Sequence, residues 1–208
     1  MEWSMQGLAN QKARWLAVVL TLIFATVPAQ GSMLPYYSSE DFSPQWHNPK
    51  PHQLKFKELV NQLGQKKQPR DWLGQVTVVN FFFTGCPGLC DLLMKRMAEL
   101  EQRLPLGTHL VSISVDPTSD TPQVLSTFGK KYQNGRLNWS LYTGDAEEIQ
   151  RMARRFFFAK NTSVDVEALL HNESFYLLDR SLNLRGVYNG TLPRSVKEIA
   201  EDVSMLRR

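Results

Sequence analysis

The pattern of hydrophobic and polar positions predicts a strand, a helix and a second strand in the middle of the chain. Residues 76–83 form a nearly unbroken run of β-branched and aromatic side chains, typical of a strand that is buried on both faces. Turn-forming residues end this run at Thr84-Gly85. Apolar positions at helical spacing follow in residues 91–100. Residues 109–115 then alternate in polarity and stop at Asp116-Pro117, which indicates another buried strand that ends in a turn.

The pattern continues to the C-terminus with further helices and strands. Thr121 and Pro122 are the N-cap and first position of the next predicted helix. The remaining predicted elements are that helix (121–132), a short strand (139–142), a helix (145–156), two strands (174–178 and 184–188) around a turn (179–183), and a closing helix (193–206). Residues 157–170 are irregular and lead to His171. This order predicts an α/β protein with a thioredoxin-like fold, a central mixed β-sheet flanked by helices.

The first residues carry the pattern of an export signal. Lys12 and Arg14 precede an apolar run over residues 15–27, and Val27-Pro28-Ala29 places small residues where a signal peptidase cleaves. The run is shorter than the roughly 20 residues that cross a bilayer as a helix. A cleaved signal peptide over residues 1–29 is therefore favoured, with an uncleaved anchor as the alternative. We expect an exported protein of the bacterial periplasm, soluble or tethered to the inner membrane through its N-terminus.

Residues 30–70 are polar and contain several prolines, so we expect a lead-in segment there and the folded domain over residues 71–208. Residues 56–63 have the spacing of a short helix. His47 and His52 lie near prolines, and we interpret them as residues of a solvated loop rather than as metal ligands.

Composition narrows the class of protein. The chain has 208 residues, 42% of them hydrophobic, and a formal net charge of +4. The basic residues are scattered and no nucleic-acid-binding motif appears, so we expect no nucleic-acid partner. Four Asn-X-Ser/Thr sequons occur, and in a bacterial protein we interpret them as chance.

The only two cysteines, Cys86 and Cys90, follow the first buried strand and stand at the start of the predicted helix. A helix N-terminus favours thiolate over thiol. Exported proteins usually keep cysteines as structural disulfides. A bridge within Cys-Pro-Gly-Leu-Cys, however, closes a very short loop and removes little entropy from the unfolded chain. A reactive pair is therefore the better interpretation.

Two thiolates at this spacing can face one metal ion, and thiolates select Cu(I), zinc or iron-sulfur clusters. His171 is the best candidate for a third ligand, with the alternative that it only caps a strand. His109, at the start of the second strand, is interpreted as structural. Two sulfurs and one nitrogen suit a three-ligand copper site better than a structural zinc site, which is usually four-coordinate.

Three motifs resemble the Sco/SenC family of copper-binding, thioredoxin-fold proteins. Residues 80–90, NFFFTGCPGLC, resemble the family pattern F-x-F-T-x-C-P-x-x-C. Residues 114–121, SVDPTSDT, resemble its S-V-D-P-x-x-D-T, and residues 170–179 are similar to the segment with the family's histidine ligand. The chain departs from many relatives in having Leu170 where they have an aspartate before the histidine. One interpretation places Asp116 near the site at the end of its strand, but not as a ligand. The alternative, equally favoured, is a turn residue before Pro117.

The resemblance implies a site of Cys86, Cys90 and His171 that binds Cu(I) or Cu(II), with a dithiol that can also cycle to a disulfide. It also implies a metallochaperone that helps to assemble the dinuclear copper centre of cytochrome c oxidase. The implied partner is the oxidase subunit that carries this centre, with another copper chaperone or thiol reductase as a further partner. The alternative is an extracytoplasmic thiol-disulfide oxidoreductase that keeps a client's cysteines reduced, and peroxide chemistry is a third, weaker option.

Overall fold

Seven strands form one mixed β-sheet in the part of the chain that the computed structural model describes, which is residues 33–47, 52–86, 88–136, 138–157 and 173–207. The strands are β1 (Leu59–Asn61), β2 (Lys66–Lys67), β3 (Thr77–Phe82), β4 (His109–Ser114), β5 (Asn138–Gly144), β6 (Ser174–Leu178) and β7 (Leu184–Asn189). Their order across the sheet is β2-β1-β5-β4-β3-β6-β7. The thioredoxin-like fold expected from the order of elements is confirmed.

The centre of the sheet is parallel. β3 pairs with β4 from Thr77 opposite His109 to Phe82 opposite Ser114, and β4 pairs in parallel with β5. All six residues of β3 are buried, as the unbroken apolar run predicts. Because parallel strands end at the same edge of a sheet, the segments after Phe82 and after Ser114 emerge side by side.

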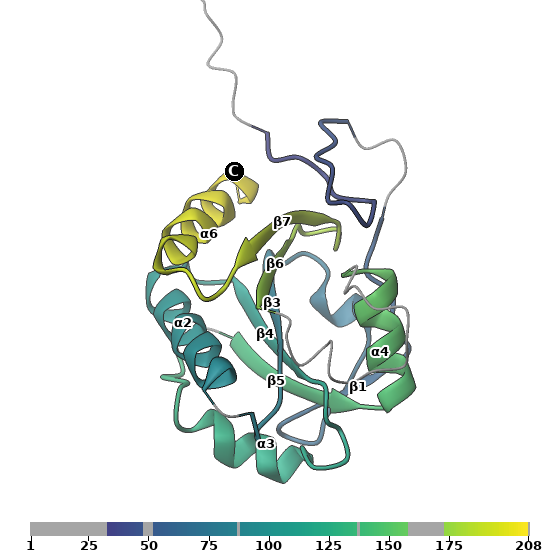
Figure 1. Cartoon of the computed structure of the whole chain (residues 1–208), viewed down its shortest axis with the longest axis vertical. Coiled ribbons are helices and arrows are strands. Elements are labelled where there is room, and N and C mark those ends of the chain that lie inside the picture. The colour runs from purple at the N-terminus through teal and green to yellow at the C-terminus, as the bar shows by residue number, and fades with distance from the viewer. Residues whose placement is uncertain (1–32, 48–51, 87, 137, 158–172, 208) are drawn as a thin grey trace, which may run out of the picture. The chain divides into compact units, whose positions relative to one another are not determined.

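Helices cover both faces of the sheet (Figure 1). They are a 3₁₀ turn, η1 (Pro69–Trp72), and the α-helices α2 (Leu89–Arg103), α3 (Pro122–Gly129), α4 (Ala146–Arg155) and α6 (Pro193–Leu206). Side chains of α2, α3 and α6 share one hydrophobic cluster with alternate residues of β3, such as Val78 and Phe82. Side chains of α4 and η1 pack in a second cluster with the intervening residues Val79 and Phe81. Among the described residues, no helix is both long enough and apolar enough to cross a bilayer.

The segment before η1 differs from its expected structure. The helix predicted over residues 56–63 is wrong, because Leu59–Asn61 form β1, which pairs antiparallel with β5. Leu54, Phe56 and Leu59 are buried in the cluster that contains α4. Residues 34–208 form one compact unit, so much of the polar stretch expected to lead into the domain contributes to its sheet and core.

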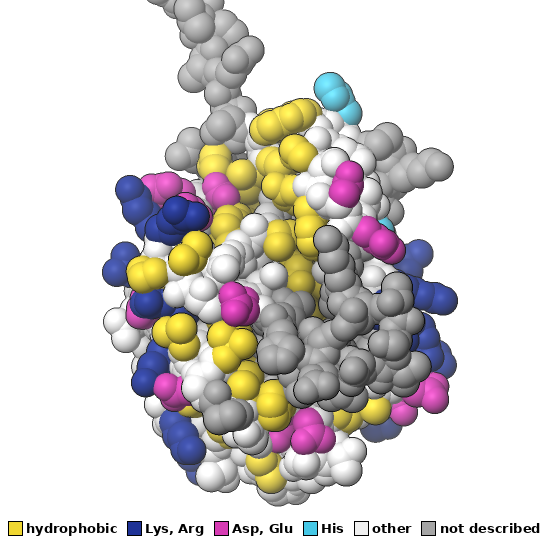
Figure 2. Space-filling model, in the orientation of Figure 1, with side chains coloured by type: hydrophobic (Ala, Val, Ile, Leu, Met, Phe, Trp, Pro, Cys, Tyr) yellow, Lys and Arg dark blue, Asp and Glu magenta, His cyan; other side chains and the backbone are white. Residues whose placement is uncertain are grey.

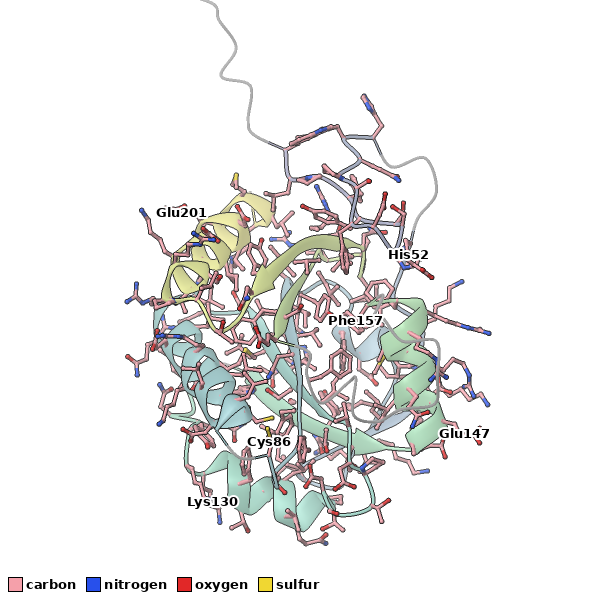
Figure 3. All side chains as sticks on the ribbon, in the orientation of Figure 1. His52, Cys86, Lys130, Glu147, Phe157 and Glu201 are labelled. Carbon is pink, nitrogen blue, oxygen red and sulfur yellow. The ribbon has the colours of Figure 1, made fainter. Side chains whose placement is uncertain are left out.

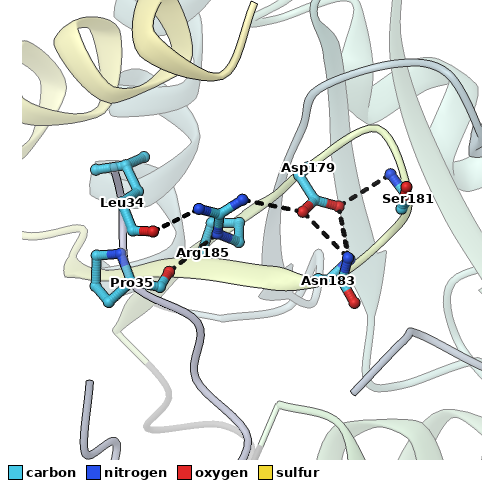
Figure 4. A network of polar contacts seen from close by, with 6 residues as sticks. All are labelled: Leu34, Pro35, Asp179, Ser181, Asn183 and Arg185. Carbon is cyan, nitrogen blue, oxygen red and sulfur yellow. Dashed lines mark hydrogen bonds and ion pairs between the residues drawn. The ribbon is translucent and has the colours of Figure 1, made fainter. Parts of the chain in front are cut away.

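A buried arginine holds the beginning of this unit (Figure 4). Arg185 of β7 is 8% exposed, and its Nε donates to the carbonyl of Pro35 at 3.0 Å. Its other nitrogens donate to the Leu34 carbonyl and to Asp179, the latter at 3.2 Å. The guanidinium also lies 3.8 Å from the ring centroid of Tyr36. We call this set of contacts the Arg185 clamp.

Charged side chains do not gather in one patch on the face shown in Figure 2. Lys and Arg side chains lie along two opposite edges, with hydrophobic and acidic side chains between them. This distribution agrees with the scattered positions of basic residues in the sequence.

Candidate metal centre

The two cysteines lie where β3 passes into α2. Figure 3 labels Cys86 in this loop. Gly88 is the N-cap of α2 and has φ of 86°, a backbone conformation that residues other than glycine rarely adopt. This turn allows Cys90 to enter the first turn of the helix while Cys86 stays in the loop. The backbone N–H of Cys90 donates to the sulfur of Cys86 at 3.4 Å. The first turn of α2 therefore folds directly over the Cys86 sulfur.

Both thiols are free, and they differ in exposure. Cys86 is half-buried, whereas Cys90 is 4% exposed and packs in the cluster that contains α2. Burial raises the pKa of Cys90 to about 12, and the neighbouring Cys86 and Asp120 act in the same direction. For Cys90, the thiolate expected at a helix N-terminus is therefore disfavoured in the metal-free protein, because burial outweighs the helix dipole.

Asp120 joins the cysteine loop to the end of β4. Its carboxylate is fully buried and accepts hydrogen bonds from the N–H of Thr84 at 3.0 Å and from the Thr84 hydroxyl at 2.5 Å. It also accepts the hydroxyl hydrogen of Ser114 at 2.5 Å. Three donors thus converge on one carboxylate, which fixes the loop two residues before Cys86.

Sequence reasoning assigned no role to Asp120 and interpreted Thr84 only as a turn residue. The available signal was that both residues lie in the motifs that resemble the family, one in each, at the ends of adjacent predicted strands. Asp116 is in the turn after β4, where its carboxylate accepts the N–H of Ser119 at 3.3 Å. This contact agrees with its interpretation as a turn residue.

The histidines lie in different parts of the chain. His171, the expected third ligand, is outside the described residues. His109 begins β4, at the opposite end of this strand from Ser114, so it is not near the cysteine loop. His47 is exposed, whereas His52 is partly buried and stacks on Phe156 with ring centroids 5.0 Å apart, so the solvated loop expected for it is wrong. Within the described residues, no three His, Cys, Asp or Glu side chains are grouped closely enough to hold a metal.

The two sulfurs are therefore the part of the expected donor set that the described structure contains. Their chemistry fits a soft ion, because Cys86 and Cys90, once deprotonated, would present two thiolates from the loop before α2 and from the first turn of α2. Copper binding would require Cys90 to lose its proton, so affinity is coupled to pH.

Comparison with known proteins identifies the family of this chain. The family model SCO1/SenC matches residues 46–207. A SCO1 protein homolog of Bacillus subtilis is 30% identical over 148 residues, which are 69% of this chain and 77% of that protein. The structure of BsSco, described as a member of the Sco family of cytochrome c oxidase assembly proteins with a disulfide switch, has a TM-score of 0.66 and 27% identity. That match covers 77% of this chain and 96% of BsSco.

A copper-bound structure has the same fold. Yeast Sco1 with copper bound has a TM-score of 0.59 and 20% identity, and the match covers 74% of this chain and 94% of that one. At this identity the likeness shows the fold, and the bound copper is a property of the yeast protein. Since the family model spans more than half of the chain, the protein belongs to the SCO1/SenC family.

Proposed function

We propose that this protein is a copper metallochaperone that assists assembly of the dinuclear copper centre of cytochrome c oxidase. Cys86, Cys90 and His171 would bind copper as Cu(I) or Cu(II) and release it to the oxidase subunit that carries the centre. The protein would act outside the cytoplasm, in the bacterial periplasm or tethered to the inner membrane, as the N-terminal export pattern predicts.

The observation that carries the proposal is the pair of free thiols held at one turn in a member of this family. The N–H of Cys90 points at the sulfur of Cys86, and Asp120 anchors the loop that carries it. Because Asp120 already holds Thr84 before copper binds, the neighbouring Cys86 loses less entropy on binding. The half-buried position of Cys86 leaves one sulfur accessible to an incoming ligand of a client.

This difference in exposure suggests that Cys86 and Cys90 have different roles during copper transfer to the client. Cys90 is buried and would hold the ion within the protein, while a client thiolate approaches from the side of Cys86. Exchange of one sulfur ligand at a time keeps the soft ion coordinated throughout, so it need not pass through water.

The same thiols support a second candidate function, a thiol-disulfide oxidoreductase. The two thiols would give two electrons and two protons to a disulfide of the client, leaving a Cys86–Cys90 disulfide and two reduced client thiols. The juxtaposition of the Cys90 N–H and the Cys86 sulfur favours it, because the two residues are already close enough for the loop to close.

Substitution of His171 separates the two candidates, because an imidazole matters to metal geometry and has no necessary part in dithiol exchange. We expect His171→Ala to retain much Cu(I) binding by two thiolates and to lose most stable Cu(II) binding, which needs a nitrogen donor. Copper titrations followed by sulfur-to-copper charge-transfer absorption measure both. His47→Ala replaces an exposed histidine and is the matched control.

The cellular experiment uses a strain that lacks the native gene and grows at limiting copper. Low oxidase activity with His171→Ala, and normal activity with His47→Ala, would support copper delivery. Full activity with His171→Ala alongside an inactive Cys86→Ser variant would instead favour the reductase.

A further inference from the structure

A pocket of about 440 Å³ lies beside the cysteine loop, on the surface of α3. Its lining residues are Thr84, Gln123, Val124, Thr127, Phe128 and Lys131. Thr84 comes from the loop after β3, two residues before Cys86, while the other five come from α3 and the turn that follows it. We call this feature the α3 pocket. It is continuous with the loop that carries the candidate metal site.

The α3 pocket and the cysteine loop are held to each other through Asp120 and Phe128. Asp120, just before α3, accepts both hydrogen bonds from Thr84. On the other side, the ring of Phe128 stacks on that of Phe82, the last residue of β3, with centroids 5.4 Å apart. Phe128 also packs against Tyr132, at 5.2 Å. A group bound in this pocket would therefore keep a fixed position relative to Cys86.

The lining of the α3 pocket combines an apolar surface with a positive charge. Val124 is one of the few large hydrophobic residues that are exposed in the described structure, at 38%. The ammonium group of Lys131 lies 5.7 Å from the centroid of the Phe128 ring. The nearby carboxylate of Asp91 pairs with Lys95 at 2.7 Å and accepts the Tyr132 hydroxyl hydrogen at 2.8 Å. The charge of Lys131 also helps to lower the pKa of Asp91, but the described structure shows no direct ion pair between them. Lys131 is therefore suited to a carboxylate from another molecule.

We propose that the α3 pocket is the docking site for a segment of the client protein, in which an apolar side chain contacts Val124 and Phe128 and an acidic side chain pairs with Lys131. This inference rests on the proposed function and specifies the surface through which it operates. An apolar anchor beside one complementary charge gives a transient complex both contact area and orientation. Docking here would bring the client's metal-binding residues to the half-buried sulfur of Cys86.

The test uses the purified copper-loaded protein and, as the probe, the soluble copper-binding domain of the oxidase subunit from the same organism. Val124→Glu and Lys131→Glu each place a negative charge in the pocket without altering a copper ligand. We expect each to lower the second-order rate of copper transfer at least tenfold, while copper affinity measured against a small chelator stays within twofold. Lys131→Arg keeps the charge and should retain the rate.

Two control variants match these changes elsewhere on the surface. Leu192→Glu replaces another exposed hydrophobic residue, at 36% exposure, and Lys57→Glu reverses an exposed lysine in a different pocket. Both should transfer copper at the wild-type rate. With the metal-free reduced protein, backbone NMR shifts caused by the probe domain should be concentrated in residues 122–131.

The outcomes distinguish this inference from the proposed function. Wild-type transfer with unchanged rates in both pocket variants, or NMR shifts confined to other surfaces, would overturn the docking site and leave copper delivery standing. Absence of both binding and transfer by the wild-type protein, although it holds copper, would overturn copper delivery and the docking site together.

Discussion

The carboxylate of Asp120 accepts hydrogen bonds from both the backbone N–H and the hydroxyl of Thr84, so one buried side chain fixes the position of the cysteine loop. The third donor to this carboxylate is the hydroxyl of Ser114, at the end of β4. All three partners are donors, and a carboxylate can only accept, so the arrangement is satisfied without any other group.

The Asp120→Asn variant should therefore loosen the loop while keeping the volume of the side chain. The amide nitrogen of the new asparagine is itself a donor and would face one of the donors from Thr84 or Ser114, so one hydrogen bond would be lost. We expect this loss to lower the free energy of unfolding by about 1–3 kcal/mol. Copper affinity should fall roughly tenfold, as for residues that support metal ligands. Hydrogen exchange of the Thr84 amide, which loses its acceptor, should become faster. Asp116→Asn is the control, since the one hydrogen bond of its carboxylate to a described residue is from Ser119, and the change should stay within about 0.5 kcal/mol. Equal effects of the two variants would contradict this role of Asp120.

Replacement of Arg185 tests the clamp on the first residues of the compact unit. In Arg185→Met, the carbonyls of Leu34 and Pro35 lose their donor and Asp179 loses its cation. We expect a loss of about 3 kcal/mol in the free energy of unfolding, because a buried pair is broken on one side. Chymotrypsin should also cleave after Tyr36 or Tyr37 more rapidly. Arg180→Met removes an exposed arginine that donates to the Arg207 carbonyl, and it should be close to neutral. Copper affinity should be unchanged in both variants.

His109 predicts a dependence of stability on pH. It is 2% exposed, neither ring nitrogen has a hydrogen-bond partner in the described structure, and its ring forms a T-shaped pair with Trp72, with centroids 5.7 Å apart. Burial lowers the pKa of His109 from 6.5 to about 4, and the nearby positive charge of Lys67 adds to this effect. The unfolded chain therefore binds a proton more readily than the folded one between these two pH values.

The sign follows directly. The contribution of neutral His109 is fully present above pH 6.5 and is lost as the pH falls towards 4, on the order of 3 kcal/mol in total. Urea unfolding at pH 7 and pH 4.5 should show a smaller decrease for His109→Leu than for the wild-type protein. The difference between the two proteins isolates this residue, because His52, whose pKa is also lowered by burial, and the carboxylates are common to both. Identical pH dependences would refute the assignment to His109.

Oxidation of the thiols should form a reversible disulfide between Cys86 and Cys90 and release bound copper, because the sulfurs cannot be thiolate ligands and a bridge at once. The closed loop has only five residues, so the bridge should change the free energy of unfolding by about 2 kcal/mol or less. Mass spectrometry with thiol labelling, copper analysis and thermal unfolding before and after oxidation measure these effects. Copper that stays bound after complete oxidation would disprove the shared use of the sulfurs.

Most of the helices and strands could be predicted from the local pattern of hydrophobic and polar residues. The bounds predicted for β6 and α6 coincide with the structure, since the first is a short apolar run between turn residues and the second begins at Pro193. The prediction for residues 56–63 failed because its apolar positions have helical spacing. Three of those residues nevertheless extend the sheet beside β5, where tertiary pairing decides the structure.

The cysteine pair was predictable because both residues lie in one short segment between a strand and a helix. The role of Asp120 was not predictable, because it depends on Thr84, which lies 36 residues earlier in a separate segment. The effect of burial on Cys90 also depends on packing by residues distant in sequence, whereas the helix N-terminus that favours its thiolate is a local feature.

The Arg185 clamp also constrains the order of events during synthesis. The carbonyls that it binds precede Arg185 by 150 and 151 residues, so these bonds require nearly the whole chain. Until β7 has been synthesised, the stretch around Leu34 has no partner on Arg185. Contacts that span such a separation form late, because closing a long loop costs entropy before any bond is gained. The stretch around Leu34 and Pro35 can therefore be held by Arg185 only after β7 has been made.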